Sequence, residues 1–159
     1  MKSKNMFVSA ATACLLLGVS GASMADECLD GTIVGQTVTD ITVNGRSCHV
    51  EDEVVQGNVT VTNSEKFALI DSKVGGALRV TGSRFARIIL NEIASGSVDV
   101  SNNELAAVLA NIAPGTMLVN SNAHAEVVRN VVTNLTCTAN LRLDSRANEV
   151  AGVNNCVTQ

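Results

Sequence analysis

The sequence predicts an all-β protein, a parallel and right-handed β-helix of about five coils with 19–20 residues in each. Apolar residues alternate with polar ones after a recurring glycine, which is the pattern of a half-buried strand. Repeats of this length are typical of solenoids, because one coil buries its apolar side only against its neighbours. Aliphatic residues recur at spacings of 20, 19, 19, 19 and 19 in the series Val54, Val74, Ile93, Ile112, Val131 and Val150.

Residues 1–25 have the pattern of a secretory signal peptide. Lys2 and Lys4 precede an apolar run over residues 6–19, and the segment 22–25 ends in the small residues that a signal peptidase reads. The run is shorter than the roughly 20 residues that a spanning helix needs. We expect cleavage after Ala25 and a periplasmic or secreted mature protein in a bacterium. Cys14 lies inside the run and is removed with the signal.

The mature chain is acidic and suits a single domain. Removal of residues 1–25 takes two of the eleven basic residues and none of the fifteen acidic ones, so nine positive charges remain against fifteen negative ones and the net charge is −6. An acidic chain without a basic cluster is a poor candidate for binding nucleic acid or an anionic membrane. Phe67 and Phe85 are its only aromatic residues, so the predicted core is aliphatic.

Residues 26–56 are predicted to form an N-terminal cap or a degenerate first coil. Ile41 and Val43 precede Val59 and Val61 by an interval close to one repeat. The segment ends shortly after the acidic run 51–53. A cap at this end blocks edge-to-edge pairing of the terminal coil.

Residues 57–159 contain the regular coils. Each coil opens on a glycine or asparagine, continues with an alternating strand and then has small polar residues that favour turns. The openings are Gly57, Gly76, Gly96, Gly115 and Asn134, and a second apolar pair follows at Leu69-Ile70, Ile88-Ile89, Val108-Leu109 and Val127-Val128.

A polar position follows the second apolar pair. It is best explained as a structural ladder of stacked side chains at a buried corner, rather than as a ligand site. Its members are Ser72, Asn91, Asn111, Asn130 and Asn148.

The handedness is predicted from the sequence periods that the repeat does not contain. No six-residue period occurs, which disfavours a left-handed hexapeptide helix. Triplets such as Phe67-Ala68-Leu69 match a pentapeptide-repeat coil only in part, because the first strand of each coil carries an additional aliphatic residue. We therefore expect the right-handed form.

The cysteine spacing predicts two disulfides. Four cysteines remain after cleavage, in a chain bound for an oxidising compartment. The sequence numbers of Cys28 and Cys48 differ by 20, and those of Cys137 and Cys156 differ by 19. Each pair is separated by one repeat, so its members should lie in adjacent coils about 5 Å apart, within reach of a disulfide. The crossed pairings would join opposite ends of the rod.

These motifs resemble those of a group of small secreted bacterial β-helix proteins. That group has V-x-G-N-V-x-V coils, a cysteine near the end of the first coil and a terminal pair of cysteines. Residues 54–61 (VVQGNVTV) and 74–80 (VGGALRV) are similar to the unit, and Cys137 and Cys156 resemble the ending. The resemblance implies a β-helix fold and a secreted life. It implies no catalytic activity, since none is assigned to the group.

The outward charges argue against catalysis. Polysaccharide lyases and hydrolases also use this architecture, but their chemistry needs carboxylates that converge on one face. Here the charges alternate in register as cross-strand pairs, which are ordinary surface contacts. They are Glu65, Arg84 and Glu104, Arg79 with Asp99, and Lys73 with Glu92. We assign no catalytic and no cofactor-binding residue.

Metal, sugar and ice binding have weaker signals. His49 and His124 are isolated and no CxxC pair occurs, so no metal site is predicted. Sugar sites favour aromatic platforms, and two phenylalanines are few. A threonine ladder for flat-surface binding is interrupted, because the column Thr62, Thr81, Ser101, Asn120, Thr138 lies beside Thr60, Arg79, Asp99, Leu118, Thr136.

The sequence therefore predicts a secreted or envelope structural or interaction protein that presents a rigid β-helical surface. The expected partner is a protein or glycan of the cell surface, or a second copy bound end to end. We expect neither nucleic acid binding nor a membrane span. The alternative is a polysaccharide-binding or polysaccharide-degrading β-helix protein.

Overall fold

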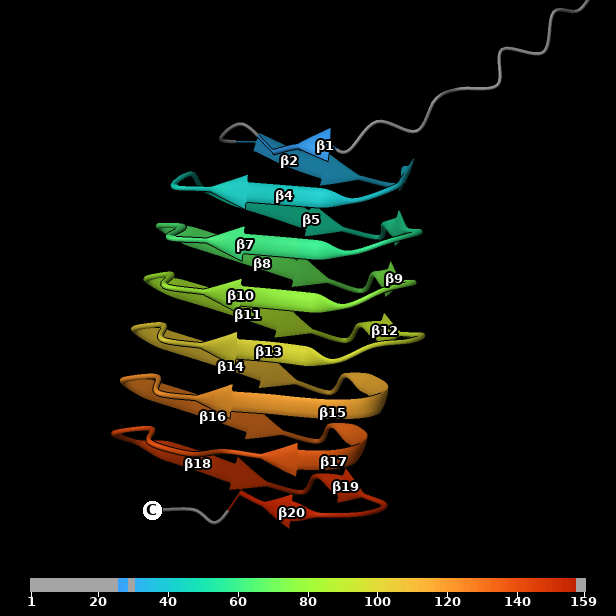
Figure 1. The fold of residues 1–159 in the computed structure, drawn as a ribbon. Coiled ribbons are helices and arrows are strands. Elements are labelled where there is room, and N and C mark those ends of the chain that lie inside the picture. Colours follow the sequence, from blue (N-terminus) through green and yellow to red (C-terminus); the bar gives the residue numbers. More distant parts are fainter. Residues whose placement is uncertain (1–25, 29–30, 157–159) are drawn as a thin grey trace, which may run out of the picture.

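The computed structural model describes residues 26–28 and 31–156, and every element in them is a strand. The chain winds into a solenoid whose strands stack in parallel along one axis (Figure 1). The predicted signal segment, with Cys14, lies outside the described residues.

Each coil has two long sides and one short side. The first long side consists of β1 Asp26–Glu27, β4 Ile41–Asn44, β7 Val59–Thr62, β10 Leu78–Thr81, β13 Val98–Ser101, the later parts of β15 Ile112–Asn120 and β17 Val131–Thr136, and β20 Asn154–Asn155. The short side consists of β3 Thr37–Val38, β6 Val54–Val55, β9 Lys73–Val74, β12 Glu92–Ile93, the starts of β15 and β17, and β19 Glu149–Val150. Since β15 and β17 turn the corner without a break, these two sides form one 13-stranded sheet.

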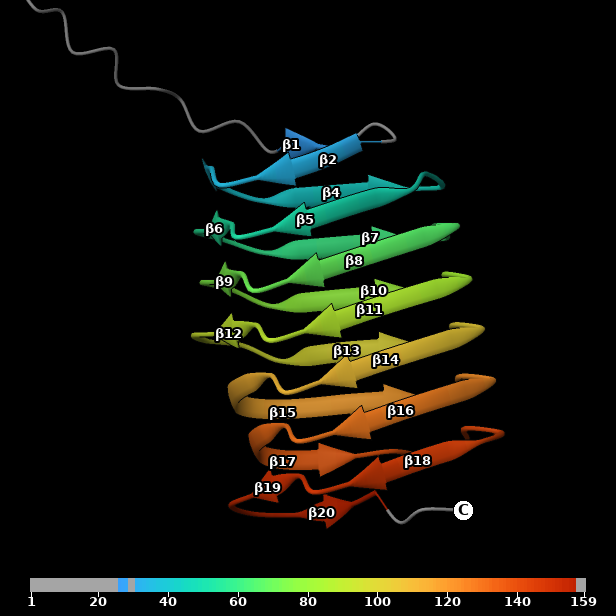
Figure 2. The same ribbon diagram turned by 180° about the vertical axis from the view of Figure 1, so that it is seen from behind.

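The second long side is a separate seven-stranded sheet on the opposite side of the solenoid (Figure 2). Its strands are β2 Gly31–Val34, β5 Cys48–Glu51, β8 Lys66–Ile70, β11 Phe85–Ile89, β14 Leu105–Leu109, β16 His124–Val128 and β18 Leu143–Arg146.

The solenoid is right-handed, as expected. As the chain descends in Figure 1, the near strands run from right to left and the far strands from left to right. Figure 2 shows the same sense from behind.

The number of coils is larger than expected. The sequence predicted about five, whereas the solenoid has about seven, one for each strand of the second sheet. The difference lies in residues 26–56. There β2 pairs in parallel with β5, β3 with β6 and β4 with β7, so this segment continues the stack.

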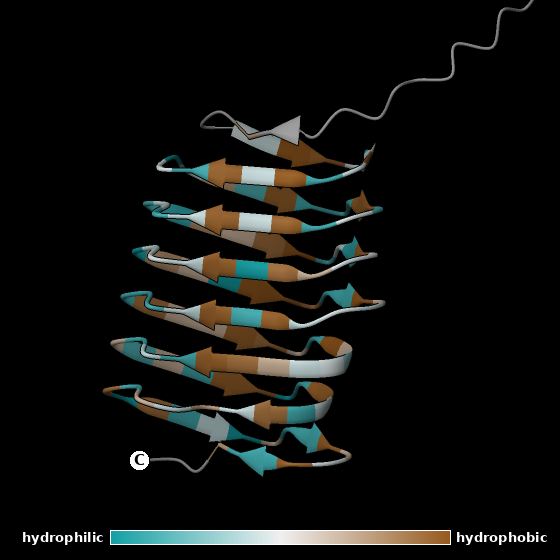
Figure 3. Ribbon diagram, in the orientation of Figure 1, coloured by the Kyte–Doolittle hydropathy of each residue, from teal (hydrophilic) through white to brown (hydrophobic). Residues whose placement is uncertain are grey.

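Columns of aliphatic side chains fill the interior. Alternation along β7, β10 and β13 places every second residue in the interior and the others outward. Hydrophobic and more polar residues alternate in the same way along these strands in Figure 3. Phe67 is the largest fully buried side chain, and the same column continues with alanines. The remaining core is aliphatic or sulfur-containing, as the sequence predicted.

The recurring series of six aliphatic residues is not a single buried column. Val74 and Ile93 are buried, but Val54, Ile112 and Val131 are 44, 54 and 41% exposed. Their inward neighbours are Val55, Ala113 and Val132. The short side is only two residues wide, and successive coils differ slightly in length. Glu92 is in register with Lys73, 19 residues earlier, but with Ile112, 20 residues later. This additional residue moves Ile112 to the outward position and its neighbour Ala113 to the inward one.

The corners at the two ends of the second sheet use a left-handed residue. At each of these positions φ lies between 48 and 68°. The two sets are Gly45, Asn63, Gly82, Asn102, Ser121 and Ala139 before the sheet, and Gly35, Asp52, Asp71, Leu90, Ala110, Arg129 and Ala147 after it. Asparagine, aspartate and glycine suit this conformation, whereas Leu90 is strained by it.

Candidate functional site on the seven-stranded sheet

The two broad outer surfaces of the solenoid differ in polarity. On the first long side the outward positions are mostly threonine, serine and asparagine: Thr42, Asn44, Thr60, Thr62, Arg79, Thr81, Asp99, Ser101, Leu118, Asn120, Thr136 and Thr138. The seven-stranded sheet carries apolar residues on its outer surface instead. We call this surface the seven-stranded face.

An apolar column crosses four consecutive strands of the seven-stranded face. Ile70, Ile89, Leu109 and Val128 lie in register on β8, β11, β14 and β16. Each is partly exposed. Glu51 on β5 and Arg146 on β18 occupy the same column directly before and after these four.

A second column runs through the middle of the face. In register it consists of His49, Ala68, Arg87, Ala107, Glu126 and Asp144. Large charged side chains therefore alternate with alanines, and we call this the central column. Nearer to the start of the strands lie Phe85 and Leu105, which are in register with each other.

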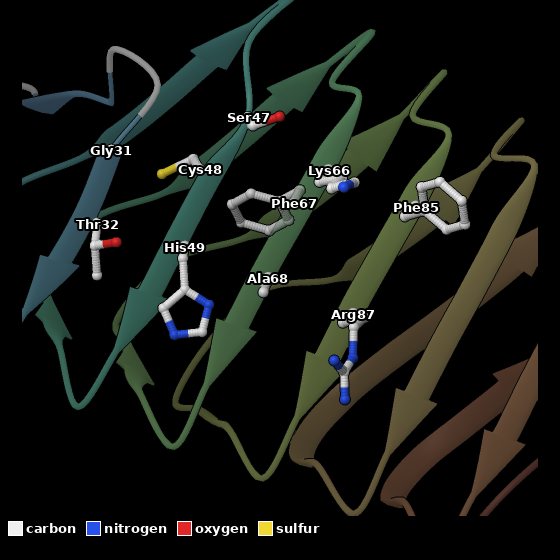
Figure 4. Close-up of a pocket in the computed structure, with 10 residues that line it drawn as sticks. All are labelled: Gly31, Thr32, Ser47, Cys48, His49, Lys66, Phe67, Ala68, Phe85 and Arg87. Carbon is white, nitrogen blue, oxygen red and sulfur yellow. The ribbon is translucent and has the colours of Figure 1, made fainter.

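The face contains three hollows, of which the first two lie over the alanines of the central column. The first has a volume of about 560 Å³ and is lined by Thr32, His49, Lys66, Ala68, Phe85 and Arg87, among others. Figure 4 shows these residues over β2, β5, β8 and β11. The second, of about 300 Å³, lies around Ala107 between Arg87 and Glu126. A third, of about 530 Å³, is lined by Leu109, Val128 and Arg146.

The polar and charged groups of the face form exposed pairs at its two ends. His49 Nε2 lies within hydrogen-bond distance of Glu51 Oε2, at 3.1 Å. Arg146 Nη2 lies 3.4 Å from both Glu126 Oε1 and Asp144 Oδ2. Pairs this exposed contribute little to folding stability and remain accessible to a partner.

The charge columns expected from the sequence are present. Arg84 pairs with Glu65 over 2.7 Å and with Glu104 over 3.5 Å, and its guanidinium stacks on the ring of Phe85. The hydrogen bond and charge of Glu65, followed by the charge of Glu104, raise the pKa of Arg84 above its ordinary value. Arg79 pairs with Asp99 and Lys73 with Glu92.

The expected ladder residues lie in one column after the second sheet, where all are buried except the half-buried Asn148. Ser72 donates its backbone N–H to Asn91 Oδ1, and the side-chain amides of Asn91, Asn111 and Asn130 each donate to the oxygen of the next asparagine, the last to Asn148. Glu53 extends the column at its N-terminal end, where its carboxylate accepts from the Gln36 N–H.

A second ladder at the opposite corner was not predicted. Ser83, Asn103, Asn122 and Asn140 are joined in the same manner over 2.8–3.0 Å. From the sequence these residues were interpreted only as turn formers. The signal was their spacing of about one repeat, the same as in the first ladder.

The cysteines form the pairs Cys28–Cys48 and Cys137–Cys156, with Cα atoms 5.8 and 4.7 Å apart. All four are buried at the two ends of the hydrophobic core. In residues 26–28 and 31–156 no group of histidine, cysteine, aspartate and glutamate is arranged to hold a metal ion. No helix in this part of the chain is long and apolar enough to cross a membrane.

The seven-stranded face was not predicted from the sequence, although its signal is present in the paired aliphatic residues. In Ile88-Ile89 and Val127-Val128 both residues are apolar, yet strand alternation forces one of them outward. Comparison of the chain with protein-family models, with curated proteins and with solved structures finds no match.

Proposed function

We propose that the mature chain is an exported, non-catalytic interaction module that binds its partner through the seven-stranded face. The main support for this proposal is that the two broad surfaces differ in polarity. One is polar, and the other has an apolar column over four coils. A contiguous apolar patch with polar residues around it is typical of an interaction site. The solenoid supplies rigidity, because each strand is paired on both sides except at the ends.

Export is supported by the two disulfides, which suit an oxidising compartment. The signal-peptide pattern in residues 1–25 and the resemblance to small secreted bacterial β-helix proteins support the same proposal. A non-catalytic role is supported by the charge pattern, since the acidic groups Glu65, Asp99 and Glu126 lie in ion pairs with arginine.

The test compares the two broad surfaces. The mature protein carries a fluorescent label at its C-terminus and is incubated with cells of the producing strain. We expect Ile89→Lys to lose most of the surface binding, because it places a charge in the middle of the apolar column. Thr81→Lys, a matched substitution on the polar surface, should bind like the parent. Equal binding by the two variants would overturn the proposal, as would cleavage of cell-surface polysaccharide by the parent protein.

A second candidate is supported by the first hollow. Phe85 offers an aromatic edge there and Lys66 and Arg87 offer two positive charges, which together suit an acidic polysaccharide. Calorimetric titration with polygalacturonate, alginate and a neutral glucan tests it. Binding of the acidic polymers that is lost in Arg87→Gln supports this candidate, and absence of heat with all three polymers contradicts it.

A further inference from the structure

We propose that the seven-stranded face binds a second copy of this chain, forming a face-to-face homodimer in which the two solenoids run antiparallel. The inference rests on the proposed function, because it names the partner of that same face. It differs from end-to-end association, which would use the terminal coils.

The apolar column places the two-fold axis. A two-fold interface must be self-complementary, so an apolar stripe has to lie across its own copy. The four apolar residues occupy four consecutive strands, and their midpoint lies between β11 and β14. An axis along the strand direction at this point sets Ile89 opposite the partner's Leu109 and Ile70 opposite the partner's Val128.

The charges at the ends of the face then become complementary, although they were not used to place the axis. In the dimer, the strand that precedes the apolar column in one copy faces the strand that follows it in the other copy. β5 therefore faces the partner's β18. Glu51 lies opposite the oppositely charged Arg146 of the partner, and the imidazole of His49, a hydrogen-bond donor, lies opposite the carboxylate of the partner's Asp144. By symmetry each contact occurs twice. Complementary charges around an apolar centre are typical of specific interfaces.

The hollows of the central column receive its large side chains. Ala68 lies opposite the partner's Glu126, which would enter the hollow between Lys66 and Arg87. Ala107 lies opposite the partner's Arg87, which would enter the second hollow beside Glu126. The carboxylate of the partner's Glu126 thus meets Lys66 and Arg87, and the guanidinium of the partner's Arg87 meets Glu126. By symmetry the same contacts form on the other side of the axis.

The other face-to-face arrangement is electrostatically unfavourable. If the axis ran along the solenoid over the apolar column, the two copies would be parallel and each residue of that column would oppose itself. Glu51 would meet the partner's Glu51, and Arg146 the partner's Arg146. Like charges that oppose each other across an interface disfavour association, so the antiparallel arrangement is selected.

The face is large enough for a stable dimer. Seven strands of four or five residues, spaced about 4.8 Å apart with about 3.3 Å for each residue, give a footprint of about 500 Å². The two copies together cover about 1,000 Å² even before side-chain relief is added, which meets the roughly 1,000 Å² expected of a biological interface.

A charge exchange tests the arrangement, with the disulfide-intact mature protein in sedimentation equilibrium over a range of micromolar concentrations. Glu51→Arg or Arg146→Glu alone sets like charges opposite each other twice, so each should weaken dimerisation at least about tenfold. The double variant Glu51→Arg/Arg146→Glu restores opposite charges across the interface and should recover most of the loss. Arg79→Glu on the polar surface is the matched control and should dimerise like the parent.

Cross-linking tests the orientation. Ile70→Cys/Val128→Cys should give a covalent dimer with a short bis-maleimide, because each cysteine lies opposite the other residue in the partner. The single variant Ile70→Cys separates the two arrangements, because residue 70 would lie opposite its own copy, and would cross-link by itself, only in the parallel one. A melting curve of each variant by circular dichroism confirms that it is folded.

Each result decides the proposal. A charge-exchange rescue together with the cross-link supports it. A monomer at every concentration, a dimer that is insensitive to Ile89→Asp, or absence of rescue overturns it. The proposed function fails separately: if the protein is monomeric but Ile89→Lys still abolishes cell binding, the face binds another partner and only the homodimer is wrong.

Discussion

Asn91 and Asn111 lie one coil apart in the buried corner after the seven-stranded sheet, and two donors of Asn91 converge on one oxygen of Asn111. The backbone N–H of Asn91 lies 3.0 Å from Asn111 Oδ1, and its side-chain Nδ2 lies 2.9 Å from the same atom. Asn111 Nδ2 in turn donates to the Ile88 carbonyl and to Asn130 Oδ1. The side chain of Asn111 therefore makes four hydrogen bonds without access to solvent.

We expect Asn111→Leu to destabilise the protein by about 3 kcal/mol or more. The substitution keeps the branching of the side chain but leaves the two donors of Asn91 and the Ile88 carbonyl without this partner in the interior. Asn120→Leu is the control, since Asn120 Oδ1 accepts from Thr138 at the surface and its loss should cost less than about 1 kcal/mol. Urea denaturation measures both. Equal losses would mean that the ladder carries no particular stability.

Ile93→Asp and Ile112→Asp should differ sharply, although both residues belong to the same recurring series. Ile93 is fully buried, so its replacement places a charge between the apolar residues of the coils above and below. Ile112 is 54% exposed, and its replacement should leave the thermal midpoint nearly unchanged. Thermal melts followed by circular dichroism compare the two. Similar midpoints would contradict the inward assignment of Ile93.

Leu90→Gly should stabilise the protein by about 0.5–1 kcal/mol. Leu90 is 56% exposed and has φ of 61°, a conformation that costs an L-residue roughly 1–2 kcal/mol. Relief of this strain exceeds the entropy that glycine adds to the unfolded chain, roughly 0.4–1 kcal/mol. Leu105→Gly, at the start of a strand in the middle of the sheet, should destabilise instead. A lower denaturant midpoint for Leu90→Gly would contradict the strain argument.

The two disulfides should stabilise the terminal coils. Each closes a loop of about 20 residues, and Cys137→Ala/Cys156→Ala should therefore cost about 3 kcal/mol. Non-reducing peptide mapping of the mature protein should recover Cys28 with Cys48 and Cys137 with Cys156. Peptides that join Cys28 to Cys137 in the monomeric protein would be incompatible with the linear stack, because these residues lie at opposite ends of it.

Much of the fold could be predicted from local patterns. Strand alternation and the recurring interval between glycines predict the parallel solenoid, and the cysteine separations match one coil. The predicted coil count was low because residues 26–56 have a shorter and more polar repeat, in which Val38 is in register with Val55. The second ladder was missed because serine and asparagine favour turns as well as buried corners.

The fold class, the length of the coil and the disulfide pairing follow from the order of the amino acids alone, because each depends on separations along one chain that stacks on itself. Which residue of an apolar pair faces the core depends instead on the assembled solenoid. At Ile112-Ala113 the larger residue lies outside, since the two-residue short side takes its direction from the coils above and below. The same stacking brings Ile70, Ile89, Leu109 and Val128, each separated by a whole coil, into one column on the outer surface. The candidate site therefore depends on the register between coils combined with the side on which each apolar residue finally lies, and only the assembled solenoid fixes the latter.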